Sequence, residues 1–560
     1  MRFLVAIGIF VLSATSLLLG VAQRTVWAPP AHYVANVTSD GKNPYLIIPA
    51  DIIAKHPGNP TVTAKQPGAV FIASGREADI QAFVGGSAKT MVYQPVNKAK
   101  FATATTAGSM PSVNPAGSDL WRSEVRSTGE AKLRIDARAE GAVLVASDGL
   151  AGAPEQIQLV WTSHFNPLVS NILLWSGLAG LLASAVIAYL VYRQMRINRG
   201  PRRRTPKAPK PPRYRYRSVF GRPERGRRVA RFEALISGGL ILAMLTGCSA
   251  STANATATPS PSTPALPVTL FSEQITRILN ETAQVADTAD QGLNKDALSE
   301  RFDGPALQVR VTNYRLRKLN SRIAAMQAIA AKPIKFSIPA ATDVWPRTMM
   351  AITDEKGDTA LPQMIVMQQD SPRENYKVWF TIRLLPGSKI PAMPPTGNGA
   401  IVVDAAAAFL KVIPQELPPV FGDVLNLGQA SLKSPLFDLN NEFYRQLSEA
   451  QKAQIVQLKK ATIKFSHTLG DPNVISLATA NGGALVAVYQ SDIDTIKPTK
   501  VGSAISVGAQ EKLLLGANGS VRGVKTVYGD MLLFYVPAVD DPGLVKLIGA
   551  TSGLISVSSL

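Results

Sequence analysis

Residues 193–251 read RQMRINRGPRRRTPKAPKPPRYRYRSVFGRPERGRRVARFEALISGGLILAMLTGCSAS. Up to Arg231, this stretch contains 16 Lys and Arg residues and a single acidic residue, Glu224. An apolar core of 11 residues, Ala234–Met244, follows and leads to Cys248, the only cysteine among 560 residues. Because basic residues flank apolar segments where a chain meets a membrane, this stretch predicts a membrane boundary between two parts of the chain.

The residues Leu245–Cys248 resemble the lipobox of bacterial lipoprotein signals, in which an aliphatic and two small residues precede a lipidated cysteine. The apolar core before them has the length of a signal core. Residues 249–267, rich in Ser, Thr and Pro, would then act as a tether. The resemblance implies a lipid on Cys248, and therefore loss of fatty-acid labelling in Cys248→Ala. The alternative is that residues 232–248 form a short transmembrane helix.

Two longer apolar stretches predict membrane segments. Residues 1–23 contain 20 consecutive uncharged positions and form either a retained membrane anchor or a cleaved signal. Residues 168–192 form a transmembrane helix with a stripe of small residues that favours helix pairing, namely Ser176, Gly180, Ser184 and Ala188. Since Lys and Arg remain in the cytoplasm, residues 193–231 are expected there, and residues 24–167 and 249–560 on the extracytoplasmic side of the plasma membrane.

The net charge of +20 is a local feature of this sequence. The loop 193–231 contributes +15, and the rest of the chain carries 43 basic and 38 acidic residues. Basic residues interleaved with tyrosines also suit nucleic acids, but the membrane flank already explains the charge, so we do not expect a nucleic-acid partner. A single cysteine excludes an intramolecular disulfide.

Residues 24–167 predict an external all-β domain, because short apolar runs alternate with clusters of Gly, Pro, Ser and Asn. No convincing helix is present, and the pattern favours a sandwich-like domain, with a barrel as the alternative. The predicted strands are Ala69–Ala73, Met91–Tyr93, Ala131–Ile135, Ala142–Ala146 and Gln156–Trp161.

The remainder predicts an external α+β region with two parts, 268–389 and 400–560, joined by a Pro- and Gly-rich linker at 390–399. The first part begins with helix-spaced apolar residues that end at a stop signal, Asp303-Gly304-Pro305. The clearest strand is Tyr376–Leu385, in which apolar and polar residues alternate. In the second part we expect helices near Val403–Val412 and Leu439–Leu458, with strands after them.

Helices followed by a curved sheet, repeated twice, are similar to tandem nuclear-transport-factor-2-like (cystatin-like) domains, so we expect two cone-shaped-sheet domains. Together with the lipobox, the tether and the phrases Val378-Trp379-Phe380 and Leu384–Gly387, this order resembles an uncharacterised family of actinobacterial envelope proteins. The fold class predicted for the whole chain is thus a multi-domain membrane protein with two or three membrane segments. The resemblance implies no catalytic residue.

The sequence contains no recognisable reactive constellation. Its four histidines, His32, His56, His164 and His467, are isolated, and His467 is best interpreted as structural. No metal-ligand spacing, phosphate-binding loop or nucleophile motif occurs. We therefore expect no catalytic, cofactor-binding or metal residues, and Cys248 is the one candidate site, for lipid attachment.

The predicted function is that of a non-enzymatic, membrane-tethered accessory or scaffold protein of the cell envelope. Its external domains would bind an envelope protein, a glycan or a lipid. The alternative is a carrier that holds a lipid or small ligand in an apolar pocket of the C-terminal domains, and enzymatic activity ranks below both.

Overall fold

The computed structural model describes residues 2–28, 30–97, 100–136, 141–162, 167–197, 268–332, 334–354, 361–395, 397–458 and 460–560. Most of the polybasic segment, the lipobox with Cys248, and the tether 249–267 lie outside the described residues. Contacts divide the chain into two compact units: Met1–Pro29 with Phe165–Ala265, and Pro30–His164 with Leu266–Leu560.

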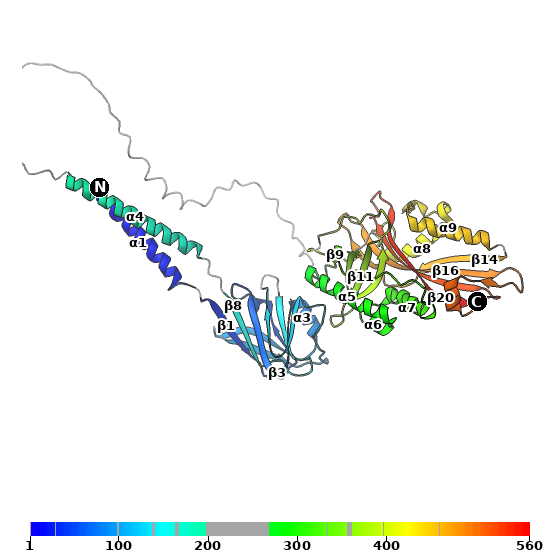
Figure 1. Cartoon of the computed structure of the whole chain (residues 1–560), viewed down its shortest axis with the longest axis horizontal. Helices are drawn as coiled ribbons and strands as arrows, with labels where there is room; N and C mark the ends of the chain where they lie inside the picture. Colours follow the sequence, from blue (N-terminus) through cyan, green and yellow to red (C-terminus); the bar gives the residue numbers. More distant parts are fainter. Residues whose placement is uncertain are drawn as a thin grey trace, which may run out of the picture. The chain divides into compact units, whose positions relative to one another are not determined.

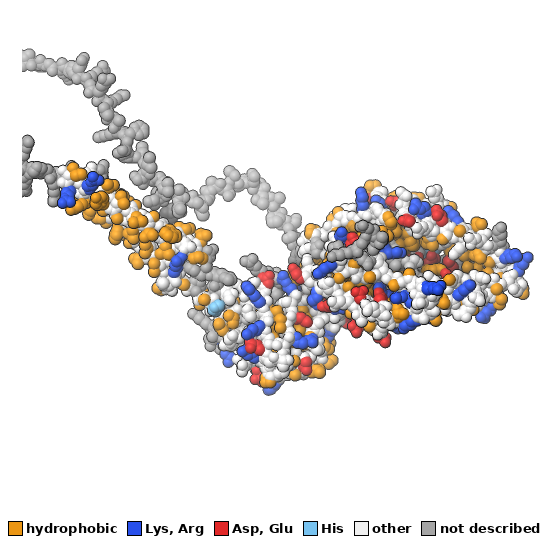
Figure 2. Space-filling view, in the orientation of Figure 1, with side chains coloured by type: hydrophobic (Ala, Val, Ile, Leu, Met, Phe, Trp, Pro, Cys, Tyr) orange, Lys and Arg blue, Asp and Glu red, His pale blue; other side chains and the backbone are white. Residues whose placement is uncertain are grey.

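The first unit is a pair of long apolar helices, α1 (Arg2–Arg24) and α4 (Leu168–Ile197). Both are long and apolar enough to cross a membrane. They lie side by side, and apolar side chains cover most of their surface (Figures 1 and 2). The Ser16 hydroxyl lies 3.0 Å from the Leu173 carbonyl oxygen, to which it donates, and 3.2 Å from the Ser176 hydroxyl.

Small residues allow the two helices to approach closely. A Cβ atom added at Gly177 would lie 2.8 Å from the backbone nitrogen of Leu17, and one added at Gly180 would lie 2.0 Å from the Ser13 hydroxyl. The predicted stripe thus faces a helix partner at Gly180, and Gly177 extends the contact beyond the stripe. This packing gives α1 a partner in the same chain.

The helix pair yields a direct prediction. In a Cys248→Ala background, cysteines at positions 16 and 176 should crosslink readily, because the two native hydroxyl oxygens are in contact. Gly177→Leu should abolish the crosslink, since its side chain would meet the α1 backbone. The matched control is Gly8→Leu, where an added Cβ has no atom within 4 Å. Equal crosslinking in both leucine variants would show that the helices do not pack in this way.

Residues 30–164 form a closed β-barrel. The strands are β1 (His32–Thr38), β2 (Tyr45–Ile48), β3 (Pro60–Arg76), β4 (Lys89–Asn97), β5 (Lys100–Thr106), β6 (Ser123–Arg134), β7 (Gly141–Ala146) and β8 (Gln156–Thr162). Seven of them close the ring in the order β3-β7-β2-β4-β5-β1-β8, and β6 pairs with β3 from outside the ring. Four of the five predicted strands lie within these elements, and the fifth, Ala131–Ile135, extends one residue beyond β6, so the prediction of a β-rich domain is confirmed.

The sandwich-like prediction was wrong, because the sheet closes on itself through β3. Each half of this strand pairs with a different neighbouring strand. The first half of β3, Pro60–Lys65, pairs with β8, and its second half, Phe71–Arg76, pairs with β7. A register shift between Lys65 and Ala69 separates the halves and bends the strand. The length of β3 and the bend within it therefore close the barrel. Local alternation of apolar and polar residues does not specify this closure.

The barrel domain also contains two helices that the sequence did not predict, α2 (Ala50–Ile53) and α3 (Glu77–Val84). Helix α3 buries Ile80 and Phe83 against an apolar cluster on the outer face of the sheet, separate from the cluster inside the barrel. At eight residues, α3 is too short for a clear helical period. The acidic residues in its first turn were the available signal.

The first α+β part contains three helices and a four-stranded antiparallel sheet (Figure 1). The elements are α5 (Ser272–Gly292), α6 (Lys295–Ser299), α7 (Gly304–Leu319), β9 (Ile334–Pro339), β10 (Arg347–Thr353), β11 (Gln363–Gln369) and β12 (Lys377–Arg383). The predicted stop at Asp303-Gly304-Pro305 lies in the break after α6, but it also begins a helix that was not predicted. The Asp303 carboxylate caps α7, and Pro305 lies in its first turn, where the ring costs no hydrogen bond.

The second α+β part builds a larger, mostly antiparallel sheet covered by helices. The elements are α8 (Leu417–Leu427), α9 (Glu442–Gln457), α10 (Ala509–Leu515), β13 (Phe437–Asp438), β14 (Ala461–Leu469), β15 (Ile475–Ala478), β16 (Ala484–Pro498), β17 (Ile505–Ser506), β18 (Gly519–Ser520), β19 (Val524–Val536) and β20 (Val545–Ser559). Residues 403–412 form turns instead of the predicted helix, and isolated bridges pair Val402 with Leu477 and Leu410 with Ala538.

The two α+β parts share one hydrophobic core. A single buried cluster contains residues of the first sheet, such as Phe380 and Met364, and residues of the second, such as Leu485 and Leu533. Backbone bridges join Leu384 to Gly549 and Ala340 to Ala400. Residues 268–560 therefore fold around a common core, and duplication of one plan stays a prediction.

Candidate functional site

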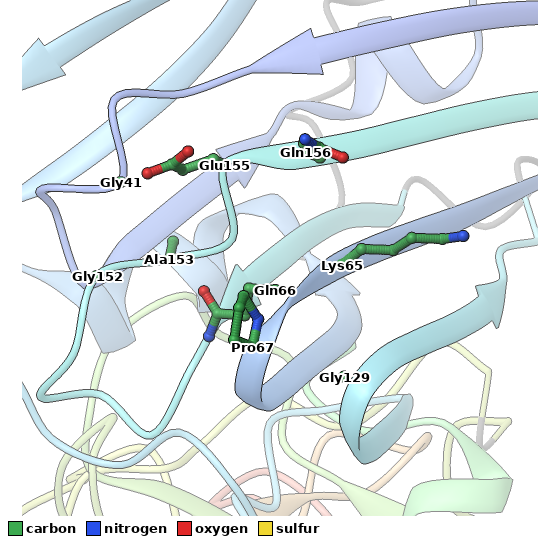
Figure 3. Close-up of a pocket in the computed structure, with 9 residues that line it drawn as sticks. All are labelled: Gly41, Lys65, Gln66, Pro67, Gly129, Gly152, Ala153, Glu155 and Gln156. Carbon is green, nitrogen blue, oxygen red and sulfur yellow. The ribbon is translucent and has the colours of Figure 1, made fainter.

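A shallow hollow of about 450 Å³ opens at one end of the barrel (Figure 3). Its lining combines one acid and one base, Glu155 and Lys65, with small or polar residues, namely Gly41, Gln66, Pro67, Gly129, Gly152, Ala153 and Gln156. Lys65 also pairs with Glu130 at 3.3 Å. The glycines supply no side-chain chemistry, so this hollow is a weak candidate site.

A second hollow, of about 560 Å³, lies between the end of α8, helix α9 and strand β14. The surface beside α9 is hollowed in Figure 2. The lining mixes exposed apolar residues, Leu427 and Ile455, with the polar side chains of Tyr444 and Arg445. The Asn441 side chain caps α9 by accepting from the Tyr444 backbone N–H at 2.9 Å, which fixes where the helix and its polar groups begin.

A buried polar cluster adjoins this hollow. His467 Nε2 lies 3.5 Å from the Gln451 amide nitrogen, and Gln451 lines the hollow. On the other side, His467 Nδ1 lies 2.9 Å from a carboxylate oxygen of Asp492 and 3.5 Å from the Gln490 amide nitrogen. The Asp492 oxygen makes no hydrogen bond of good geometry, so its approach to the ring is a close contact without a hydrogen bond. Gly422 lets α8 pass close to His467.

Carboxylates surround this cluster on β16 and β19. Burial raises the pKa of Asp530 to about 7, and the neighbouring Asp492 adds to the rise. Burial also raises the pKa of Asp494 to about 7, with a further contribution from Asp492. Two carboxylic acids that ionise near neutral pH are therefore packed within one sheet.

The geometry supports the structural interpretation of His467. Its side chain is 0% exposed, so the ring touches other side chains and does not reach the hollow surface. His56 stacks on Tyr33 at a ring distance of 4.3 Å, His32 lies on β1, and His164 lies outside the described residues. Within the described ranges, no group of three His, Cys, Asp or Glu side chains is arranged to hold a metal ion.

The most extensive polar arrangement joins the barrel to residues 268–560 within the second unit. At its first centre, Arg347 from β10 contacts Asp79 from α3 at 2.8 Å, and both side chains are 1% exposed. Arg76, on the barrel, also contacts Asp79 at 2.7 Å. The Arg347 guanidinium lies 3.6 Å from the centre of the Trp345 ring, and this cation–π contact stabilises a cation whose Nε and Nη2 have no hydrogen-bond partner.

The second centre is Asp119 of the barrel, which is fully buried. Arg301 donates to its two oxygens at 2.6 and 3.2 Å, and the Tyr376 backbone N–H donates to one of them at 2.7 Å. Arg301 also pairs with Glu281 of its own part at 2.5 Å. This bidentate arrangement orients the guanidinium and satisfies the buried carboxylate.

The third centre is Arg373, which lies in the turn before β12. Its guanidinium donates to the carbonyl oxygens of Phe83, Val84 and Pro111 and to the Ser87 hydroxyl, at 2.7–3.0 Å. Helix α3 ends at Val84, so two of these acceptors are terminal helix carbonyls, which favour a cation. Arg373 thus clamps the C-terminal end of α3.

Fifteen side-chain hydrogen bonds between described residues cross from the barrel to residues 268–560. Stable interfaces between separate proteins carry about 10 ± 5 such bonds. Trp345 adds an apolar anchor by packing on the outer cluster of the barrel. The contact therefore has the character of a specific protein–protein interface.

No pattern along the chain indicates this interface. Asp79 and Arg347 are 268 positions apart, and each resembles an ordinary surface charge when its neighbours along the chain are considered alone. The one site residue that the sequence predicted, Cys248, lies outside the described residues.

Comparison with known proteins adds one match. A family model described as "Domain of unknown function (DUF8094)" matches residues 268–559. No curated protein and no solved structure matches the chain. The matched region coincides with the two α+β parts that share a core.

Proposed function

We propose that this chain, which belongs to the DUF8094 family of domains of unknown function, is a non-enzymatic accessory or scaffold protein of the cell envelope. The observation that carries this proposal is the polar interface between the barrel and residues 268–560. A scaffold has to hold its binding surfaces at fixed positions, and buried bidentate ion pairs restrict relative movement more than exposed contacts do.

We further propose that the barrel and residues 268–560 are held at a membrane. Helices α1 and α4 would anchor them in the plasma membrane, with residues 24–167 and 249–560 extracytoplasmic and residues 193–231 cytoplasmic. The basic loop supports this orientation. A lipid on Cys248 would add a second anchor, and two anchors give stable attachment where a single acyl chain is marginal.

Family relationships beyond DUF8094 belong to the same proposal. Helices precede an antiparallel sheet in residues 268–389, and α8 and α9 precede most of the sheet in residues 400–560. This order supports a relation to tandem nuclear-transport-factor-2-like domains and to actinobacterial envelope lipoproteins.

A site-specific photocrosslinking experiment tests the scaffold function. A photoreactive residue at Ile455, in the hollow beside α9, should give a discrete adduct with another envelope component in intact cells. The matched position is Val501, which is also apolar and is more exposed but lies away from the hollow, between β16 and β17. Absence of any adduct at Ile455, together with migration of the native protein as a lone monomer, would contradict a scaffold role.

The hollow also favours the alternative, a carrier of a small ligand. Its volume of about 560 Å³ lies within the usual range of ligand pockets, and apolar Leu427 and Ile455 accompany polar Tyr444 and Arg445. Native mass spectrometry of the purified full chain distinguishes the two functions. A copurifying lipid or metabolite that Ile455→Arg removes would favour the carrier.

A further inference from the structure

Two of the four buried charges at the interface have an ionic partner on their own side as well as across it. Asp79 contacts Arg76 of the barrel as well as Arg347 across the interface. Arg301 contacts Glu281 of its own part as well as Asp119 across the interface. Among the described residues, Arg347 and Asp119 meet their ionic partners only across the interface. Docking thus pairs two charges that lack an ionic partner within their own body, and this favours association of the two bodies.

The connection between the two sides is long. Strand β8 ends at Thr162, and the first described residue of the C-terminal part is Val268, so more than 100 residues separate the two surfaces in sequence. Short linkers supply effective concentrations of roughly millimolar, and longer ones supply less. The contacts themselves, with fifteen hydrogen bonds and an aromatic anchor, are therefore expected to provide most of the association.

We infer that the barrel and residues 268–560 form a complex that does not need the polypeptide between them. A chain cut anywhere within residues 198–267, including before Cys248, would remain assembled as two bound polypeptides. Processing at the lipobox would then yield a two-chain complex in which the barrel polypeptide carries helices α1 and α4. This inference goes beyond the proposed function, because it holds whether or not an envelope partner exists.

The test uses the full chain, purified in detergent, with a protease recognition sequence inserted between Ser260 and Pro261 and a tag at the C-terminus. After complete cleavage and dilution to low micromolar concentration, the N-terminal polypeptide should remain bound to the tagged one. Retention should persist at 1 M salt, because buried ion pairs are screened much less than exposed ones. Release of the N-terminal polypeptide within minutes at physiological salt would overturn the inference.

Two variants link retention to the interface. Arg373→Ala removes four hydrogen bonds to the barrel from a partly exposed side chain, so the uncleaved variant should still fold, as circular dichroism would verify. Its cleaved form should release the N-terminal polypeptide at least tenfold faster. Lys132→Ala, at an exposed pair on the barrel, is the matched control and should dissociate like the unmodified protein. Equal rates for all three proteins would overturn the assignment of the association to this interface.

Discussion

Asp119→Ala is expected to lower the free energy of unfolding by about 3–5 kcal/mol, the cost of removing one partner from a buried ion pair. The substitution leaves the Arg301 guanidinium buried with Glu281 alone and deprives the Tyr376 backbone N–H of its acceptor. Denaturant unfolding of the purified full chain, followed by near-ultraviolet circular dichroism, measures the loss as a lower midpoint.

The matched control for this variant is Glu130→Ala. Glu130 also has two basic partners, Lys65 and Lys132, but its contacts are exposed and screened by water. Its removal should leave the unfolding midpoint unchanged. If the two alanine variants unfold at the same denaturant concentration, then Asp119 does not hold the barrel and residues 268–560 together.

Asp530→Asn is expected to stabilise the protein at pH 8 and to have no effect near pH 4. In the folded protein, burial raises the pKa of Asp530 from 3.8 to about 7, helped by Asp492 and Asp494 and opposed by Ser552 and His467. The unfolded chain therefore releases this proton near pH 4, whereas the folded chain holds it until about pH 7. Folded stability falls across this window as pH rises, and the loss is complete above pH 7.

The asparagine variant removes this loss, because its side chain stays neutral. Each pKa unit corresponds to about 1.4 kcal/mol, so a shift from 3.8 to about 7 gives a gain at pH 8 on the order of 4 kcal/mol. Denaturant unfolding of both proteins at several pH values between 4 and 8 measures the difference. Asp540→Asn, at an exposed position, should leave the pH dependence as it is. If Asp530→Asn stabilises the protein by the same amount at every pH, then the Asp530 carboxyl does not hold a proton in the folded core.

Local patterns in the sequence predicted both long apolar helices, the five strands named for the barrel domain and the strand at Tyr376–Leu385. Alternation in Tyr376–Leu385 matched β12, and the uncharged run from Leu168 matched α4, because both depend on neighbours two to four positions away. Helices α7 and α8 were not predicted, although proline in a first helical turn marks a beginning as well as an end. At α7 the signal was interpreted as a stop alone, and at α8 no helix was expected.

Local patterns in the amino-acid sequence thus predict where the chain is apolar enough to cross a membrane, where many strands form and where the charge lies. They do not predict that β3 closes a barrel, that the two α+β parts share a buried cluster, or that Asp79 and Asp119 meet arginines more than 180 positions away. These features depend on which residues are buried together after folding. The same aspartate is an ordinary surface residue in water, but once buried it requires a cation within hydrogen-bonding distance.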